Sequence, residues 1–281
     1  MWERDTQSIY WTDINRFLVH RFLLQDGTVK TWFFPEPVTC VMETNRQDTL
    51  ALSLGSGIVL WKPDSHEPHT HLFALPGWPF VRCNDAAVDP GGVLWVGTMR
   101  NNVLANGAPE DHGGRNGVLY RVEGTGAASE WRHGLGISNT LLWSPDRSRF
   151  YFGDSLQNCI WSYEYDAAGK TIRGEQPFFQ DFERGSPDGS AMDSEGFLWN
   201  CRFFGGCIVR VAPDGTIDRV VEMPVKNITT CTFGGADRKT LYVTTAKIEA
   251  PAGDRLAGGL YAVPTDVAGQ PENQFRAFPR S

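Results

Sequence analysis

A polar turn followed by a short strand recurs along this chain, and this repeat limits the possible folds more than any other feature. Each run is rich in aromatic and β-branched residues, which is typical of β-strands. The six runs lie at residues 8–13, 49–53, 92–97, 149–154, 196–200 and 240–244. The spacing is roughly 40 to 60 residues, the size of a four-stranded blade, so the sequence predicts a six-bladed β-propeller.

Second strands follow five of these runs and carry the same residue pattern. They lie at residues 57–61, 117–121, 159–163, 207–211 and 259–263. A β-sandwich is the competing all-β interpretation, but it gives no reason for a repeat of this length. We therefore expect residues 1–281 to form a single propeller domain.

Composition excludes several classes of function. The chain has 281 residues, of which 41% are hydrophobic and 21% are charged, as in globular proteins. Its net charge of -7 argues against nucleic acid as a partner, because there is no basic stripe to contact phosphates. No run of about 18 apolar residues predicts a membrane helix. The six cysteines lack C-x-x-C spacing, so we expect buried thiols in a cytoplasmic protein.

Three polar segments precede strand pairs by about ten residues and are the candidate functional segments. A propeller binds its ligands in a central channel lined by loops between blades, and equivalent offsets place side chains at one height around that channel. The segments, residues 81–85, 136–140 and 186–189, are predicted loops. The repeat therefore predicts that four of their side chains converge: Arg82, Asn84, Asn139 and Asp188.

These four residues suit a metal-assisted hydrolysis. Carboxylate and amide oxygens favour Ca²⁺ or Mg²⁺ and tolerate Mn²⁺ or Zn²⁺. Asp188 could serve as both ligand and base, and Arg82 could stabilise negative charge developing on a carbonyl oxygen. The combination predicts cleavage of an ester or lactone. The competing interpretation is that Asp188 only caps a turn.

Five segments together resemble the senescence marker protein / gluconolactonase / regucalcin-like family over nearly the whole chain. They are YWTDI at 10–14, RCNDAAVDPGGVLWVGTM at 82–99, GISNTLLWSPD at 136–146, SPDGSAMDSEGFLWN at 186–200 and PVKNITTCTFGG at 224–235. The resemblance implies a six-bladed propeller that hydrolyses a small-molecule sugar lactone with one divalent metal ion. Calcium or zinc is the first expectation, with manganese or magnesium as alternatives.

The resemblance also implies roles for individual residues. Asn139 and Asp188 match the family's metal ligands, and Asp188 is the expected catalytic base. Arg82 and Asn84 match residues that hold the substrate near the metal.

The sequence departs from the family pattern at its N-terminus. The remaining metal ligand is a Glu four residues before a Trp that Trp2 matches, so that Glu would precede Met1 and is absent. A closing N-terminal strand is also missing, whereas Glu3 matches a strand position after the Trp. Two interpretations stay open, a start site downstream of the true one and an incomplete metal site. An unclosed ring would leave a strand edge through which the chain could dimerise.

The sequence departs from the family pattern at two further places. Thr140 stands where Gly usually follows the ligand Asn. Some relatives carry a substrate-binding Glu before Gly117, and here Glu110, Asp111 and His112 lie in that region without a clear match.

Other polar signals are interpreted as structural. We expect residues 66–71, which hold three His, to be a solvated loop, and residues 193–196 to be a turn. Asp85 and Asp154 are expected to bond backbone groups, and Arg202 suits either the channel or the surface. The core residues between blades are predicted to include Trp11, Trp95 and Trp199.

Two rival functions stay open. One is a non-catalytic, metal-deficient propeller that binds a ligand. The other is a different metal-dependent hydrolysis on the same scaffold, for example of phosphotriesters. No G-x-S-x-G or H-E-x-x-H motif supports a serine hydrolase or a zinc protease.

Overall fold

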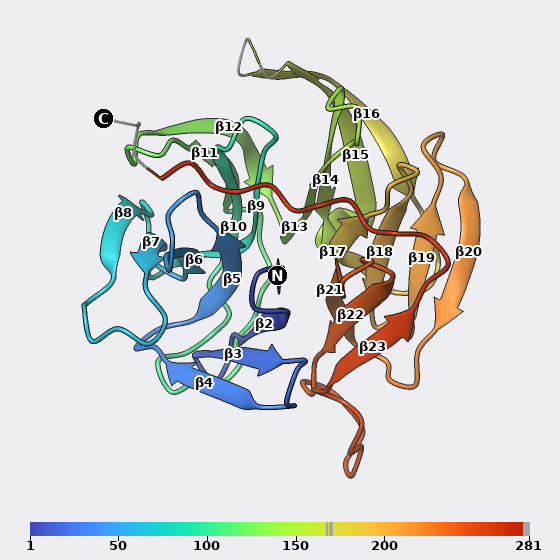
Figure 1. Ribbon diagram of the computed structural model, residues 1–281. Helices are drawn as coiled ribbons and strands as arrows, with labels where there is room; N and C mark the ends of the chain where they lie inside the picture. The colour runs from blue at the N-terminus through green and yellow to red at the C-terminus, as the bar shows by residue number, and fades with distance from the viewer. Residues whose placement is uncertain (167, 169–170, 278–281) are drawn as a thin grey trace. The chain divides into compact units, whose positions relative to one another are not determined.

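The chain is built almost entirely of β-strands (Figure 1). The computed structural model describes residues 1–166, 168 and 171–277. Within these ranges it has six antiparallel sheets, five of four strands and one of three, and a single 3₁₀-helix, η1 (Ser155–Gln157). The predicted six-bladed β-propeller is confirmed. In the part of the chain that the structure describes, no helix has the length and apolarity needed to cross a membrane.

The chain divides into two compact units, of which the first holds residues 3–138 together with Met1 and residues 272–277. Its sheets have the orders β1-β2-β3-β4, β5-β6-β7-β8 and β12-β11-β10-β9. The strands are β1 (Trp2–Glu3), β2 (Ser8–Asp13), β3 (Leu18–Leu23), β4 (Val29–Phe33), β5 (Val38–Glu43), β6 (Leu50–Leu54), β7 (Gly57–Trp61), β8 (Thr70–Ala74), β9 (Val81–Val88), β10 (Leu94–Arg100), β11 (Gly117–Val122) and β12 (Ala128–Leu135).

The second unit holds residues 139–271 together with Trp2. Its sheets have the orders β13-β14-β15-β16, β17-β18-β19-β20 and β21-β22-β23. The strands are β13 (Ser138–Trp143), β14 (Arg149–Asp154), β15 (Cys159–Asp166), β16 (Thr171–Gln180), β17 (Ser186–Met192), β18 (Leu198–Phe203), β19 (Cys207–Val211), β20 (Ile217–Glu222), β21 (Ile228–Gly234), β22 (Thr240–Thr245) and β23 (Leu260–Pro264). Every strand run predicted from the sequence overlaps one of the strands in the two units.

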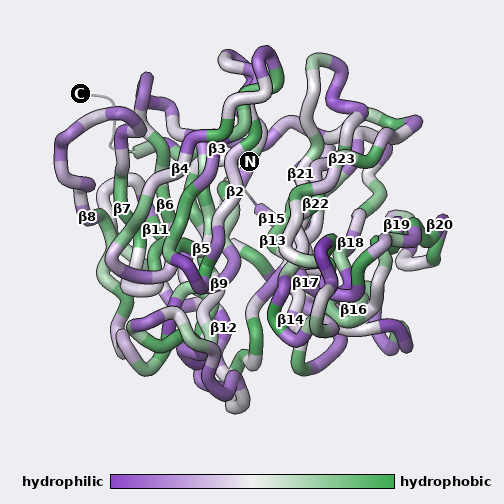
Figure 2. The backbone as a smooth tube through the Cα atoms, turned by 90° about the horizontal axis from the view of Figure 1, so that it is seen from below, coloured by the Kyte–Doolittle hydropathy of each residue, from purple (hydrophilic) through white to green (hydrophobic). Residues whose placement is uncertain are grey.

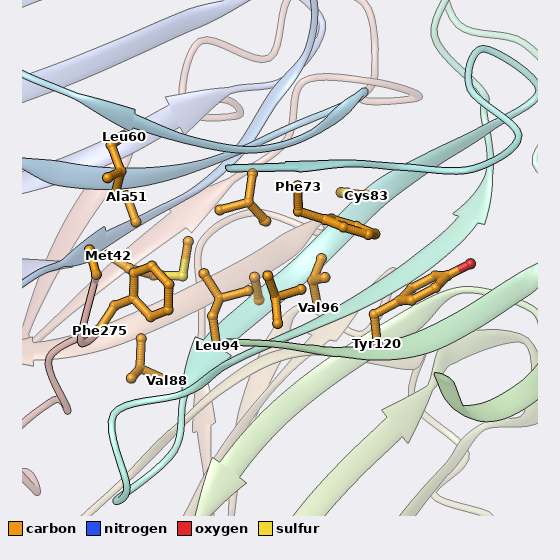
Figure 3. Close-up of a cluster of buried hydrophobic side chains, with 14 of the residues drawn as sticks. Met42, Ala51, Leu60, Phe73, Cys83, Val88, Leu94, Val96, Tyr120 and Phe275 are labelled. Carbon is orange, nitrogen blue, oxygen red and sulfur yellow. The ribbon is translucent and has the colours of Figure 1, made fainter. Parts of the chain in front are cut away.

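Apolar residues in these strands form the core. Figure 2 shows hydrophobic residues concentrated along strands such as β6, β7 and β11. In the first unit, fully buried Phe275 from the C-terminal segment packs beside Met42 and Val88 (Figure 3). The amide of Phe275 donates to the carbonyl of Glu43 at 2.9 Å. The C-terminal segment therefore contributes both a core side chain and backbone hydrogen bonds to this unit.

A buried aspartate organises the turn before two of the repeated strands. Asp89 Oδ1 accepts from the amides of Gly91 and Val93, and its Oδ2 accepts from Trp95 Nε1 at 3.1 Å. Because one carboxylate holds both the turn and the indole of the next strand, it fixes the tryptophan in the core. Trp95 is fully buried.

Asp193 repeats this arrangement in the second unit, so the predicted turn at 193–196 is confirmed. Its Oδ1 accepts from the amides of Glu195 and Phe197, and its Oδ2 accepts from Trp199 Nε1 at 2.9 Å. Trp199 is buried as predicted. Trp11 is only half-buried and stacks on His20 with the ring centres 4.9 Å apart, so its assignment to the core was wrong.

The three candidate segments lie largely in strands, so their prediction as loops was wrong. Arg82 and Asn84 belong to β9, Asn139 to β13 and Asp188 to β17, each at an edge of its sheet. Glycine and proline suggested turns, but an edge strand tolerates proline because one row of its amides needs no ladder partner. The structure therefore carries these polar side chains on strands, which hold them more rigidly than loops.

Candidate active site

In the first unit, Arg82 and Asn84 are held by one another. Buried Arg82 donates from Nη1 to Asn84 Oδ1 at 2.7 Å, and from Nε and Nη2 to Asn102 Oδ1 at 3.0 and 2.7 Å. Asn84 Nδ2 donates to the carbonyl of Ser138 at 2.8 Å. These bonds fix a cation and an amide on the same edge strand, so the structure brings this predicted pair together.

In the second unit, hydrogen bonds link the strands that carry Asn139 and Asp188. Asn139 Nδ2 donates to Ser155 Oγ at 2.8 Å, and Ser155 Oγ donates to the carbonyl of Pro187 at 2.6 Å. Thr140 Oγ1 donates to the carbonyl of Asp188 at 2.6 Å. Asn139 is therefore linked through Ser155 to Pro187, and its neighbour Thr140 is bonded to Asp188. These bonds join β13 to β17 and bring the second predicted pair, Asn139 and Asp188, together.

The main chain at Asp188 is irregular. Pairing of β17 with β18 joins Pro187 to Arg202 and Ser190 to Asn200, and the register shifts between them. A bulge of this kind redirects a side chain out of the regular alternation. Asp188 lies in the bulge and is half-buried.

Gly189 explains how a neighbouring strand approaches this bulge so closely. A Cβ added at Gly189 would lie 2.1 Å from Thr230 Oγ1 and 3.0 Å from the Cα of Thr230 in β21. Any larger residue would push β21 away from the strand that carries Asp188. The Pro-Asp-Gly sequence therefore forms the bulge of β17, and its glycine is required because β21 approaches it closely.

Arg202 is buried beneath the Asp188 segment, which the sequence left undecided. Its side chain is 1% exposed and packs on the ring of Phe182. Burial lowers the pKa of Arg202 to about 10. Its guanidinium donates to three carbonyls and two amide side chains, namely Phe182 O, Arg184 O, Gly185 O, Asn158 Oδ1 and Asn200 Oδ1. This cation therefore orders the chain that enters β17.

We expect Arg202→Lys to lower the free energy of unfolding by about 1–3 kcal/mol, because an ammonium cannot reproduce the planar set of donors. Chemical denaturation followed by tryptophan fluorescence measures the change. Arg184→Lys is the matched control, since exposed Arg184 bonds Gly205 and Glu222 on the same segment. Equal stability of Arg202→Lys and the parent would contradict a structural role for this guanidinium.

Buried thiols do not supply a nucleophile. Burial raises the pKa of the Cys83 thiol to about 12 and that of Cys201 well above its usual value, with Cys231 adding to the second shift. Both thiols are protonated at neutral pH, and a thiol reacts as its thiolate. The candidate chemistry near β9 and β18 therefore does not proceed through these cysteines.

Several discounted signals have structural roles. Asp154 caps η1 by accepting from the amide of Leu156 at 3.0 Å, and Asp85 accepts from the amide of Ala86 at 2.9 Å. In the loop before Gly117, exposed Asp111 pairs with Arg100 at 3.2 Å. The Glu3 carboxylate accepts from the hydroxyls of Thr6 and Ser8.

Asn139 and Asp188 fit part of a site for a hard cation. Donation from Asn139 Nδ2 to Ser155 fixes the amide plane, so its oxygen faces the other way. Amide and carboxylate oxygens are the donors that Ca²⁺ and Mg²⁺ prefer. Within the described residues, no three His, Cys, Asp or Glu side chains group around a metal position, and the Asn139–Asp188 pair itself supplies one carboxylate.

Some residues that shape this site were not recognised from the sequence. Asn102 anchors Arg82, and Ser155 links Asn139 to β17. Asn102 lies in the loop after β10 and Ser155 opens η1, and no motif marks either residue. Thr140 could have been recognised, because it stands where the family pattern has glycine. Its φ is positive, at 54°, a conformation that favours glycine.

Comparison with known proteins points to one family. The family model described as SMP-30/Gluconolactonase/LRE-like region matches residues 1–247. A 6-deoxy-6-sulfogluconolactonase of Pseudomonas putida is 33% identical, with 98% of this chain and 93% of that protein covered. A pentonolactonase of Haloferax volcanii is 30% identical, with coverage of 97% and 91%.

Among solved structures, a calcium-binding protein, regucalcin, from Agrobacterium tumefaciens has a TM-score of 0.89 to this chain at 25% identity. The alignment covers 98% of this chain and 92% of that one. Sequence and structure comparisons therefore agree over nearly the full length.

Proposed function

Because the chain belongs to the SMP-30/gluconolactonase/LRE-like family, we propose that it is a divalent-metal-dependent hydrolase of a sugar lactone. One observation carries the proposal: hydrogen bonds through Ser155 and Thr140 hold Asn139 and Asp188 on linked strands. Two relatives act on sugar lactones by name, and a structural neighbour is named a calcium-binding protein.

Asn139 and Asp188 are the residues that would hold the metal, as the resemblance implies. A bound divalent cation polarises a carbonyl and lowers the pKa of a coordinated water. Calcium or zinc is the first choice and manganese or magnesium the alternative, since all accept oxygen ligands. The family pattern has a third protein donor, a Glu at a position that would precede Met1.

Asp188 is proposed to act as the general base. Its carboxylate takes a proton from the water that adds to the lactone carbonyl carbon. The bond between that carbon and the ring oxygen then breaks, and the ring oxygen receives a proton. The product is the open-chain hydroxy acid, so atoms and charge balance without another reactant.

Arg82 and Asn84 are proposed to hold oxygens of the substrate. Arg82 is buried and its guanidinium is oriented by Asn102, so it offers a fixed positive charge. Such a group stabilises negative charge on an oxygen better than a mobile one. Asn84 is oriented by Arg82 in turn.

The test is hydrolysis of gluconolactone and of pentonolactones, followed as acid release with the spontaneous rate subtracted. Protein stripped with a chelator should lose at least about 10-fold in turnover, and one of Ca²⁺, Zn²⁺, Mn²⁺ or Mg²⁺ should restore it. Calorimetric titration of the stripped protein with each cation gives the affinity without substrate.

Three results would oppose the proposal. Turnover that chelation does not change would overturn the metal requirement, but the assignment as a lactone hydrolase would stand. Absence of turnover on every lactone with every cation would overturn the hydrolase. Lactone binding without hydrolysis would favour a ligand-binding propeller instead.

A further inference from the structure

Thr140 has an unusual backbone for its residue type. It is fully buried, follows Asn139 directly and has a φ of 54°. This left-handed region crowds the Cβ, so β-branched residues rarely adopt it, whereas glycine does so easily. Strained conformations of this kind persist where the surrounding structure uses them. The side chain of Thr140 must therefore contribute something that glycine would not.

The Thr140 hydroxyl bonds the main chain of the bulge in β17. Asp188 lies in the bulge of β17, outside the register that pairs Pro187 and Ser190 with β18. Thr140 Oγ1 donates to the carbonyl of Asp188 at 2.6 Å, and Asn200 Nδ2 lies farther from that carbonyl, at 3.4 Å. The short bond from β13 therefore holds the main chain of the bulge at the residue that carries the carboxylate.

The number of protons available decides which groups donate in the hydrogen bonds around Thr140. A hydroxyl has one proton to donate, and Thr140 gives its proton to Asp188, so Ser190 Oγ donates to Thr140 across 2.8 Å. Ser190 accepts from Asn200 Nδ2 at 2.9 Å, and Asn200 Oδ1 accepts from Arg202 Nη1 at 3.2 Å. A buried cation thus polarises a chain of donors that ends on the Asp188 carbonyl.

We propose that Thr140 is a positioning residue whose hydroxyl, supported by Ser190, Asn200 and Arg202, holds the main chain so that Asp188 is presented beside Asn139. This inference rests on the proposed function, since it assigns Asp188 and Asn139 to one site. The residue acts through Asp188 and does not touch the substrate.

Three substitutions separate the hydroxyl from the shape of the side chain. Thr140→Val keeps the branched shape without the hydroxyl, Thr140→Ser keeps the hydroxyl with less crowding, and Thr140→Gly removes both hydroxyl and strain. Loss of the hydroxyl should weaken cation affinity and kcat by about 10- to 100-fold, as for other groups that orient metal ligands. Thr140→Ser should stay within about 3-fold of the parent.

Hydrogen exchange adds a readout that needs neither substrate nor metal. Amides of residues 186–192 should exchange about 10-fold faster in Thr140→Val than in the parent or Thr140→Ser, because the bond at Asp188 is lost. Thr140→Gly should combine weak cation binding with a Tm equal to or above that of Thr140→Val, since its backbone strain is relieved.

The outcomes distinguish this inference from the proposed function. Faster exchange in Thr140→Val with an inactive parent would support the positioning role and reject the lactonase. An active parent with equal kcat, cation affinity and exchange in Thr140→Val would overturn the positioning role alone. Equal losses in Thr140→Ser and Thr140→Val would also overturn it, because packing would then explain the effect.

Discussion

Replacing Asp188 by Asn should reduce lactone hydrolysis by about 10³-fold or more in kcat, because the change removes both the general base and the anionic metal ligand. The amide has the same shape, and the main chain at Asp188 is held by Thr140 through its carbonyl, which the substitution preserves. The variant should therefore fold normally. The measurement is kcat and KM at saturating cation, with circular dichroism and Tm as checks on folding.

A second Ser-Pro-Asp sequence in the same unit provides a matched control. Asp146 follows Ser144 and Pro145, as Asp188 follows Ser186 and Pro187. Hydrogen bonds from Ser144 and Ser148 lower the pKa of Asp146, which lies in an exposed turn. Asp146→Asn should leave kcat within about 2-fold of the parent. A turnover in Asp188→Asn above one tenth of the parent's would exclude Asp188 as the base.

Replacing Asp193 by Asn should lower the free energy of unfolding by about 3–5 kcal/mol, the usual cost of removing one partner of a buried ion pair. Asp193 is fully buried, and its Oδ2 accepts from Arg210 at 2.9 Å from Nε and 2.7 Å from Nη2. The same oxygen accepts from Trp199 Nε1. An amide nitrogen placed there would face three donor nitrogens, and an amide oxygen placed there would lack the negative charge that pairs with Arg210.

Asp89 is the matched control for this prediction. It holds the equivalent turn and tryptophan in the first unit through the same pattern of hydrogen bonds, without the arginine among those partners. Asp89→Asn should therefore cost less, about 1–2 kcal/mol. Urea denaturation of the two variants measures the difference in their free energies of unfolding. The dependence of that free energy on urea concentration is compared between the variants. Equal losses would show that the Arg210 pair adds no stability to the Asp193 turn.

The sequence alone determined the strands and the fold class, because these depend on local signals. The run at 8–13 and the run at 149–154 coincide with β2 and β14 in both bounds. Alternating aromatic and β-branched residues favour strands over short stretches, and glycine or aspartate turns separate them. Repetition at a spacing of roughly 40 to 60 residues then restricts how such strands can be assembled.

The tertiary structure decided how the candidate residues are held, because that depends on residues distant in sequence. The Ser-Pro-Asp-Gly stretch reads locally as a loop, yet its pairing with β18 and its approach to Thr230 make it a bulged strand. Arg202 has five acceptors that no spacing rule brings together. In the sequence Thr140 was only a departure from the family pattern. In the structure its hydroxyl donates a hydrogen bond to the carbonyl of Asp188, 48 residues along the chain. Local sequence sets the strand, but a side chain's partners are set by which strands pack together.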